Sequence, residues 1–305
     1  MVGLPASTDP ALRLSRPASS TSPVLTCAGH SLELSRPVVM GVINTTPDSF
    51  ADGGTLYRSQ CLDLDLAMSR ARAMAAEGAA ILDIGGESTR PGATLVTPAQ
   101  EMDRVLPLVE RIAAEIDVVI SVDTSSPALM TEAAALGAGL LNDVRALTRE
   151  GALEAAAATG LPVCLMHMRG QPDTMQEAPQ YDDVVAEVAD FLARRVAACE
   201  SAGIGRERLV LDPGFGFGKT VEHNLQLLGG LSRLAQLGLP LLAGLSRKSM
   251  IEKLIGRGVA ERLPASLALA VLAAERGAAI IRAHDVAATV DALAMWAALA
   301  EVEEV

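Results

Sequence analysis

Short apolar segments alternate with longer segments of helical spacing from about Val38 to the end of the chain. Each apolar segment is hydrophobic almost throughout, which is typical of a strand buried on both faces of a sheet. Eight such segments are present, at residues 38–43, 79–84, 118–123, 140–144, 162–167, 209–212, 239–246 and 278–284. The pattern therefore predicts a parallel sheet of eight strands.

Ala- and Leu-rich segments between these strands have the spacing of helices. They cover residues 60–77, 99–116, 127–137, 150–159, 182–202, 221–237, 264–276 and about 286–300. A left-handed residue commonly ends a helix, and five glycines lie where a helix gives way to a strand: Gly78, Gly137, Gly160, Gly238 and Gly277. Eight strand–helix units close into a (β/α)8 TIM barrel, since an open sheet of that width exposes two edges. A doubly wound sheet is the alternative.

A length of 305 residues suits one large domain with a single core. We expect residues 23–305 to form the barrel, with a small hairpin at about 23–36 under its floor. Residues 1–22 are rich in Ser, Pro, Thr and Ala without a period, so they bury too little apolar surface to offset the entropy of ordering. We therefore expect them to be a disordered N-terminal extension.

Composition narrows the class of protein. The net charge of −12 contains no basic run, which argues against nucleic acid as a partner. The four cysteines are widely spaced, which favours a reducing compartment over a zinc site or a disulfide framework. No signal peptide is recognisable, and no apolar run reaches the roughly 20 residues of a membrane span. We expect a soluble, cytoplasmic protein.

Polar residues follow every predicted strand, at the end of a barrel where active sites are built. They are Asn44, Asp83, Glu87, Asp123, Asn142, Asp143, His167, Asp212, residues 246–248, Arg282 and His284. Any one of them is explained equally well as a helix cap or a loop carboxylate, but a polar group at all eight ends indicates a site. Asp143 and Asp285 are better explained as caps of the helices that follow them.

Aromatic residues are also unusually placed. Three of the four phenylalanines, Phe50, Phe215 and Phe217, lie in Gly-rich segments. They would suit a planar ligand. For Phe215 and Phe217, packing inward beneath their own loop is an equally good explanation.

Four segments resemble the loops of dihydropteroate synthases: GVINTTPDSFADGG (41–54), LDIGGESTRPGA (82–93), LDPGFGFGKT (211–220) and SRKSM (246–250). NDV (142–144), MHMRG (166–170) and RAHDV (282–286) agree in order and spacing, so the resemblance runs from about residue 36 to the end of the chain. It departs slightly at Thr45, Ala51 and Ala283. The resemblance implies condensation of 6-hydroxymethyl-7,8-dihydropterin pyrophosphate with p-aminobenzoate to give 7,8-dihydropteroate and pyrophosphate.

The resemblance also implies which residues bind the pterin and the pyrophosphate. Those for the pterin are Asp123, Asn142, Met166, Asp212, Phe217, with Phe215 as a possible second wall, and Lys248. Those for the pyrophosphate are Asn44, Thr89, Arg90, Arg282 and His284. Asn44 would also ligate a Mg2+ ion, which prefers few protein oxygens together with substrate phosphates.

Two Gly-rich loops, one after each of the first two strands, would form the p-aminobenzoate pocket. By resemblance its residues are Phe50, Thr89, Pro91, Lys248 and Ser249. Asp52, Arg90 and Lys248 would assist the chemical step, Asp52 by stabilising a pterin cation. We expect sulfonamides to compete for this pocket.

Family members are usually homodimers, and the apolar terminal helices suit such an interface. One alternative is a methyltetrahydrofolate methyltransferase, whose barrel also binds a pterin. The TRP of the second loop and the SRK motif argue against it. The other is a pterin-binding relative without catalytic activity, although both loops are complete here.

Overall fold

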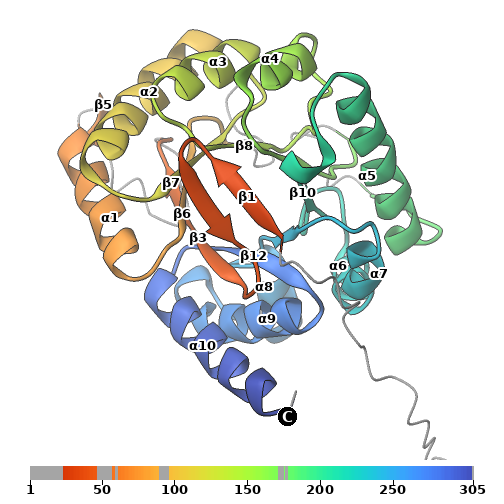
Figure 1. Cartoon of the computed structure of the whole chain (residues 1–305). Coiled ribbons are helices and arrows are strands. Elements are labelled where there is room, and N and C mark those ends of the chain that lie inside the picture. The colour runs from red at the N-terminus through yellow and green to blue at the C-terminus, as the bar shows by residue number, and fades with distance from the viewer. Residues whose placement is uncertain are drawn as a thin grey trace, which may run out of the picture.

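The computed structural model describes residues 23–46, 57–58, 61–88, 96–170, 175 and 178–303. Eight parallel strands form a closed barrel, so the predicted barrel is confirmed and the doubly wound sheet is wrong. The barrel strands are β3 (Val38–Asn44), β6 (Ile81–Gly85), β7 (Val119–Asp123), β8 (Leu140–Asp143), β9 (Val163–Met166), β10 (Leu209–Asp212), β11 (Leu241–Ala243) and β12 (Ala278–Ala283). Figure 1 shows the helices as a ring around them.

The helices that follow the strands lie close to their predicted ranges. They are α1 (Leu64–Ala76), α2 (Pro98–Glu115), α3 (Pro127–Ala135), α4 (Ala152–Thr159), α5 (Val184–Ser201), α6 (Val221–Gly229), α7 (Leu231–Ala235), α8 (Ser249–Ile255), α9 (Leu263–Glu275) and α10 (Val286–Glu303). All five punctuating glycines have a positive φ, as predicted, between +72° and +105°. Short elements complete the chain: β4 (Tyr57–Arg58), β5 (Cys61–Leu62) and the 3-10 turns at Arg206–Arg208 and Val259–Glu261.

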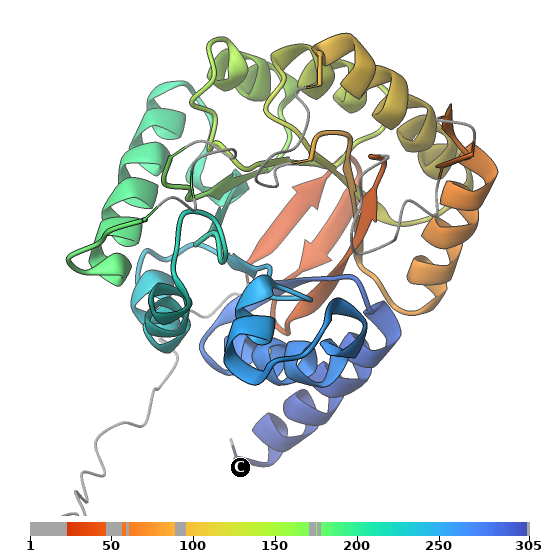
Figure 2. The same ribbon diagram turned by 180° about the vertical axis from the view of Figure 1, so that it is seen from behind.

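The predicted hairpin is present as β1 (Val24–Cys27) and β2 (His30–Glu33), paired antiparallel. Its inward side chains Leu25 and Cys27 pack against the first inward residues of the barrel strands, such as Met40 and Ile81. Gly139 lies directly against Cys27, where an added Cβ would come within 3.1 Å of the Cys27 Cβ. The hairpin therefore closes the N-terminal end of the barrel, facing the viewer in Figure 1 and lying behind the barrel in Figure 2.

Two predicted elements differ from the structure. The helix expected at 221–237 is divided at Gly230 into α6 and α7. The strand expected at 239–246 ends at Ala243, and the seven-residue α8 was not predicted after it. Both differences lie where glycine interrupts the pattern. The expected disorder of residues 1–22 lies outside the described residues.

Candidate active site

A cavity of about 610 Å3 opens at the carboxyl ends of the barrel strands, opposite the hairpin. Ten of the predicted site residues line it: Asn44, Asp123, Asn142, Met166, Asp212, Phe217, Lys248, Ser249, Arg282 and His284. They come from strands or loops far apart in sequence, and the closure of the barrel brings them together. The other predicted residues, Phe50, Asp52, Thr89, Arg90 and Pro91, lie outside the described residues.

A buried ionic network forms the deep wall of the cavity. Arg282 donates from Nε to Asp83 Oδ2 over 2.6 Å and from Nη2 to Asp123 Oδ2 over 3.1 Å. Asp83 is fully buried and also accepts from Ser121 Oγ at 2.6 Å and from Asn142 Nδ2 at 3.2 Å. Sequence reasoning placed Asp83 at a strand end but did not assign it to the site. The structure makes it the link between two predicted site residues, Arg282 and Asn142.

This network changes the protonation of Asp123. Burial and then the charge of Asp83 raise the pKa of Asp123 to about 8, against the opposing effect of Arg282. Burial lowers the pKa of Arg282, but Asp83 and Asp123 together raise it above its usual value. Arg282 therefore stays charged, beside a carboxyl group that is harder to ionise than a free aspartate. A planar heterocycle would meet both a cation and a potential O–H donor here.

Asp212, at the end of β10, accepts a hydrogen bond on Oδ1 from the Gly214 amide at 2.7 Å. Burial raises the pKa of this carboxyl, and hydrogen bonding from Gly214 opposes the change. Both Asp212 and Met166, at the end of the neighbouring β9, line the cavity. The arrangement places a buried acceptor beside an apolar surface, which suits a ring with donors along one edge.

The loop after β10 carries the two phenylalanines. Phe215 is only 1% exposed and belongs to the core, so the interpretation that it packs inward is confirmed, although it also borders the cavity. Phe217 lies at the cavity wall with Lys248 Nζ 4.4 Å from its ring centre, within cation–π range. Lys248 therefore joins the loops after β10 and β11.

The turn that presents Lys248 is held in an uncommon conformation. Arg247 has a φ of +55°, and its guanidinium donates to Asp285 from Nε at 3.0 Å and from Nη2 at 2.5 Å. Its amide donates to Ser266 Oγ at 3.0 Å. The turn thus directs Ser246 and Lys248 to the cavity. Asp285 is structural, as predicted, but it acts by binding Arg247.

His284 lies beside Arg282 and shares a 3.0 Å contact between its Nδ1 and Ser246 Oγ. Burial, followed by the charges of Arg282 and Arg247, lowers its pKa to about 3. The imidazole is therefore neutral at physiological pH. Because His284 N also donates to Ser246 Oγ, at 3.2 Å, the ends of β11 and β12 are joined at this corner.

A second ion pair stands at the rim, next to the loop after β6. Glu87 and Arg145 form two hydrogen bonds of 3.0 Å, and their side chains are 12% and 10% exposed. Asp143 accepts from the amides of Arg145 and Leu147 at 2.8 and 2.7 Å, which confirms its structural role. The predicted helix cap is wrong, because α4 begins at Ala152 with Gly151 as its N-cap, and Asp143 instead holds the turn after β8. The Glu87–Arg145 pair fixes the stem of the loop that carries Thr89 and Arg90 in the sequence.

His167 was predicted among the polar strand ends, but the described cavity wall does not include it. The ring is buried, and its Nδ1 lies 2.9 Å from Lys219 Nζ. Burial, followed by the charge of Lys219, lowers its pKa to about 2. His167 therefore packs beneath the cavity wall, against Lys219.

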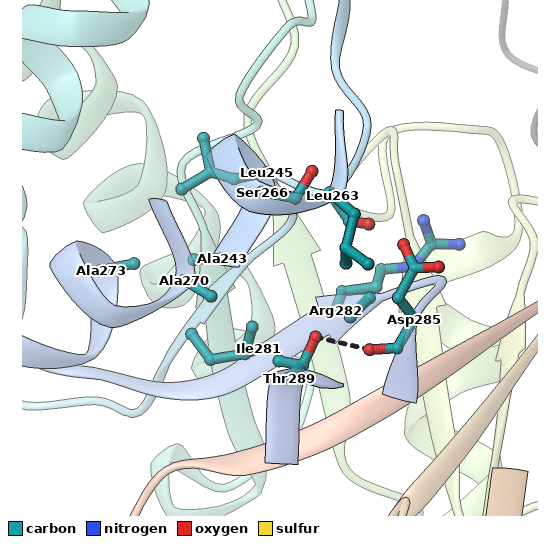
Figure 3. A pocket seen from close by; sticks show the side chains of 12 residues that line it. Ala243, Leu245, Leu263, Ser266, Ala270, Ala273, Ile281, Arg282, Asp285 and Thr289 are labelled. Atoms are coloured by element: carbon teal, nitrogen blue, oxygen red, sulfur yellow. Dashed lines mark hydrogen bonds between the residues drawn. The ribbon is translucent and has the colours of Figure 1, made fainter. Parts of the chain in front are cut away.

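A much smaller cavity of about 10 Å3 lies between β11, β12, α9 and α10, behind the polar corner (Figure 3). Ala243, Ala270 and Ile281 give it apolar walls, and Thr289 Oγ1 donates to Asp285 O at its edge. Its volume is near the lower limit for one water molecule. It is a packing space and not a ligand site.

Among the described residues, no three His, Cys, Asp or Glu side chains are grouped so that they could hold a metal ion. Asn44, at the end of β3, lines the cavity with a carboxamide. A single oxygen of this kind fits Mg2+, which keeps several waters and binds substrate phosphates. None of the described helices is long and apolar enough to cross a membrane.

Comparison with known proteins identifies the family. The profile described as "Pterin binding enzyme" matches residues 40–284. The dihydropteroate synthase of Escherichia coli K12 is 54% identical over 276 residues, which cover 90% of this chain and 96% of that protein. The chain belongs to the dihydropteroate synthase family.

Two solved dihydropteroate synthases have the same fold. The Yersinia pestis enzyme, in complex with a sulfonamide drug, is 52% identical with a TM-score of 0.88, over 91% of this chain and 99% of that one. The Xanthomonas albilineans enzyme, in complex with 7,8-dihydropteroate, is 50% identical with a TM-score of 0.81. The match covers 91% of this chain and 98% of that one. The family resemblance read from the sequence is therefore confirmed.

Proposed function

We propose that this chain uses the cavity to condense 6-hydroxymethyl-7,8-dihydropterin pyrophosphate with p-aminobenzoate, as a dihydropteroate synthase. The observation that carries the proposal is the convergence of ten predicted site residues on one cavity at the carboxyl end of the barrel. Family membership and the relative that holds 7,8-dihydropteroate support the same reaction.

The pterin would lie deepest, against the buried polar groups. Asp212 would accept hydrogen bonds from the 2-amino group and N3, while Asn142 and Asp123 would bind the ring's other polar positions. Met166 and Phe217 would cover its faces. A buried polar group left unpaired costs about 1–3 kcal/mol, so analogues without matching donors should be rejected.

The pyrophosphate would extend from the pterin toward the corner where Arg282 and His284 line the cavity. Arg282 supplies a permanent positive charge, and the neutral imidazole of His284 can donate one N–H. Thr89 and Arg90 would complete the phosphate site from the loop after β6. A Mg2+ ion held by Asn44 and phosphate oxygens would neutralise the leaving group.

In the chemical step, the bond between the pterin methylene carbon and the pyrophosphate oxygen breaks, and its electron pair leaves with pyrophosphate. The electron-rich dihydropterin stabilises the resulting cation, assisted by Asp52. The amine of p-aminobenzoate then forms the new C–N bond and loses one proton to solvent. Lys248 and Arg90 would stabilise the charges that separate.

The p-aminobenzoate would occupy the outer part of the cavity. Lys248 and Ser249, at the start of α8, line the cavity and would contribute to this part of it. Phe50, Thr89 and Pro91 would complete the pocket from the two loops. A sulfonamide would bind in the same place, since the Yersinia pestis relative is described in complex with one.

A homodimer is also proposed, with α10 in its interface. Met295, Leu299 and Val302 are 73%, 60% and 72% exposed, and their spacing places them on one face of the helix. The end of α10 extends beyond the helical ring in Figures 1 and 2. We propose a cytoplasmic location, which agrees with the buried free thiols of Cys27, Cys164 and Cys199.

A coupled assay for pyrophosphate release tests the function. The purified chain, supplied with dihydropterin pyrophosphate and Mg2+, should release pyrophosphate in proportion to added p-aminobenzoate. Dihydropteroate should appear in equal amount. Pterin binding without product would indicate a relative that has kept only the pocket.

A further inference from the structure

Lys219 is a buried cation behind the cavity wall. Its side chain is nearly inaccessible, and Nζ donates to the Gly214 carbonyl at 2.8 Å and to the Phe217 carbonyl at 3.0 Å. Nζ also lies 2.9 Å from His167 Nδ1, which belongs to the loop after β9. Since the His167 imidazole is neutral, its Nδ1 can accept from the ammonium group. The described cavity wall does not include Lys219, so it does not contact the ligand space directly.

The loop from Asp212 to Lys219 is shaped around this ammonium group. Gly214, Gly216 and Gly218 have φ values of +70°, +82° and +62°, so the backbone turns repeatedly in the left-handed region. An added Cβ at Gly214 would lie only 1.9 Å from the carbonyl oxygen of His167. The close approach directs carbonyl oxygens inward onto Nζ. Burying a charged amine is costly unless it is surrounded by such acceptors.

The same loop residues carry the groups that face the cavity. The Gly214 amide donates to Asp212 Oδ1, and the Gly214 carbonyl accepts from both Lys219 Nζ and the Phe217 amide, the latter at 3.1 Å. The ring of Phe217 in turn lies under Lys248 Nζ. Lys219 therefore contacts the backbone of Gly214, the residue whose amide binds the proposed pterin acceptor, and the backbone of Phe217, which forms the aromatic wall. Burial lowers the pKa of Lys219 to about 7, and Asp212 acts in the opposite direction.

We propose that Lys219 is a positioning residue for pterin binding: its ammonium group holds the loop at residues 213–218 so that Asp212 and Phe217 are set before the ligand arrives. The inference rests on the proposed pterin site. It predicts that loss of the ammonium group weakens pterin binding without a comparable effect on the step that follows.

The variant K219M keeps the length of the side chain and removes its charge. We expect its affinity for a bare pterin to fall at least tenfold in calorimetric titration, and its KM for the pterin pyrophosphate to rise similarly. Its kcat, and its KM for p-aminobenzoate at saturating pterin pyrophosphate, should change less than threefold. R206M, which removes an exposed cation far from the cavity, should match the unsubstituted chain.

Chemical rescue separates positioning from a general structural role. K219A leaves space for propylammonium, which should restore at least half of the lost pterin affinity, while tetramethylammonium at equal ionic strength should restore none. Pterin affinity of K219M within twofold of the unsubstituted chain would overturn the inference. So would folded K219A that does not respond to propylammonium. Failure of the unsubstituted chain to bind pterin would instead overturn the proposed function.

A measurement on the unsubstituted chain covers the case in which neither variant folds. The chain has three lysines, Lys219, Lys248 and Lys253, so selectively labelled lysine gives a simple NMR spectrum. Pterin binding should shift the Lys219 side-chain signal and slow its hydrogen exchange, although Lys219 lies outside the cavity wall. A Lys219 signal unchanged at saturating pterin would overturn the inference.

Discussion

Arg282 donates from Nε to Oδ2 of the fully buried Asp83 over 2.6 Å, and this bond joins the last strand of the barrel to its second. Removing one partner of a buried ion pair leaves the other charge uncompensated, at a cost of about 3–5 kcal/mol. We therefore expect D83A to lower the free energy of unfolding by about 3 kcal/mol in urea titrations. The double variant D83A/R282M should lose less than the two single variants summed.

The exposed pair Arg257–Glu261 provides the comparison, since both side chains are more than half exposed. E261A should cost less than about 1 kcal/mol, as exposed pairs generally do. Equal costs for D83A and E261A would show that the Asp83 network does not stabilise the barrel.

Asp212 is the proposed anchor for the pterin. D212N should weaken pterin binding by at least about 1.4 kcal/mol, or tenfold, because an amide offers one acceptor where the ring presents two donors. Calorimetric titration with a bare pterin measures this loss. The control D190N lies on the exposed side of α5 and should bind as the unsubstituted chain does. An unchanged affinity in D212N would mean that another residue anchors the ring.

Binding of p-aminobenzoate should depend on prior binding of a pterin and pyrophosphate. Its proposed pocket uses Phe50, Thr89 and Pro91 from two Gly-rich loops. Phosphate oxygens would bind Arg90 from the second of these loops and Asn44, the last residue of β3, directly before the first. Binding of the pterin and pyrophosphate would then order the two loops. The free energy needed to order them would no longer reduce the affinity for p-aminobenzoate. Titrating p-aminobenzoate into the apo chain, then into the complex with pterin, pyrophosphate and Mg2+, compares the two affinities. Equal values would indicate a preformed pocket.

Glu101 should make stability depend on pH. It lies buried beneath Gly86, and burial raises its pKa from 4.5 to about 7, opposed by a hydrogen bond from Thr124. The folded chain therefore keeps a proton that the unfolded chain releases between these values. The resulting stabilisation is complete below pH 4.5 and is lost as the pH rises through 7. The free energy of unfolding should fall by roughly 3 kcal/mol in all.

The comparison with E101Q isolates this contribution from other titrating groups. The free energy of unfolding of the unsubstituted chain, relative to E101Q, should decrease between pH 4.5 and 7 and stay level above. A constant difference over this interval would show that Glu101 is ionised throughout in the folded chain.

The barrel could be predicted from the sequence because each strand is a short apolar segment. Such a segment is recognised from its own residues, without knowing which other parts of the chain it contacts. The ends of the helices could also be predicted from local sequence, since glycines such as Gly78 and Gly277 adopt the positive φ that ends a helix. The seven residues of α8 were too few to give a helical period, and Gly230 divided a helix that the pattern showed as one.

The candidate site was predicted as a set of residues but not as a network. Asp83 and Arg282 are 199 residues apart, and nothing local indicates that their side chains meet. Lys219 was missed for a related reason: a lysine beside a Gly-rich loop suggests an exposed charge, and only the fold turns the carbonyls onto it. The family resemblance located the site residues at the ends of the strands. Which of them form ion pairs depends on how the eight strands close into the barrel.

The hairpin β1–β2 closes one end of the barrel, so the described cavity opens at the opposite end. Because the proposed pterin site lies deepest, the pterin would have to enter before p-aminobenzoate. A pterin bound against Asp212 would then lie beneath p-aminobenzoate, and the two would leave joined as one product.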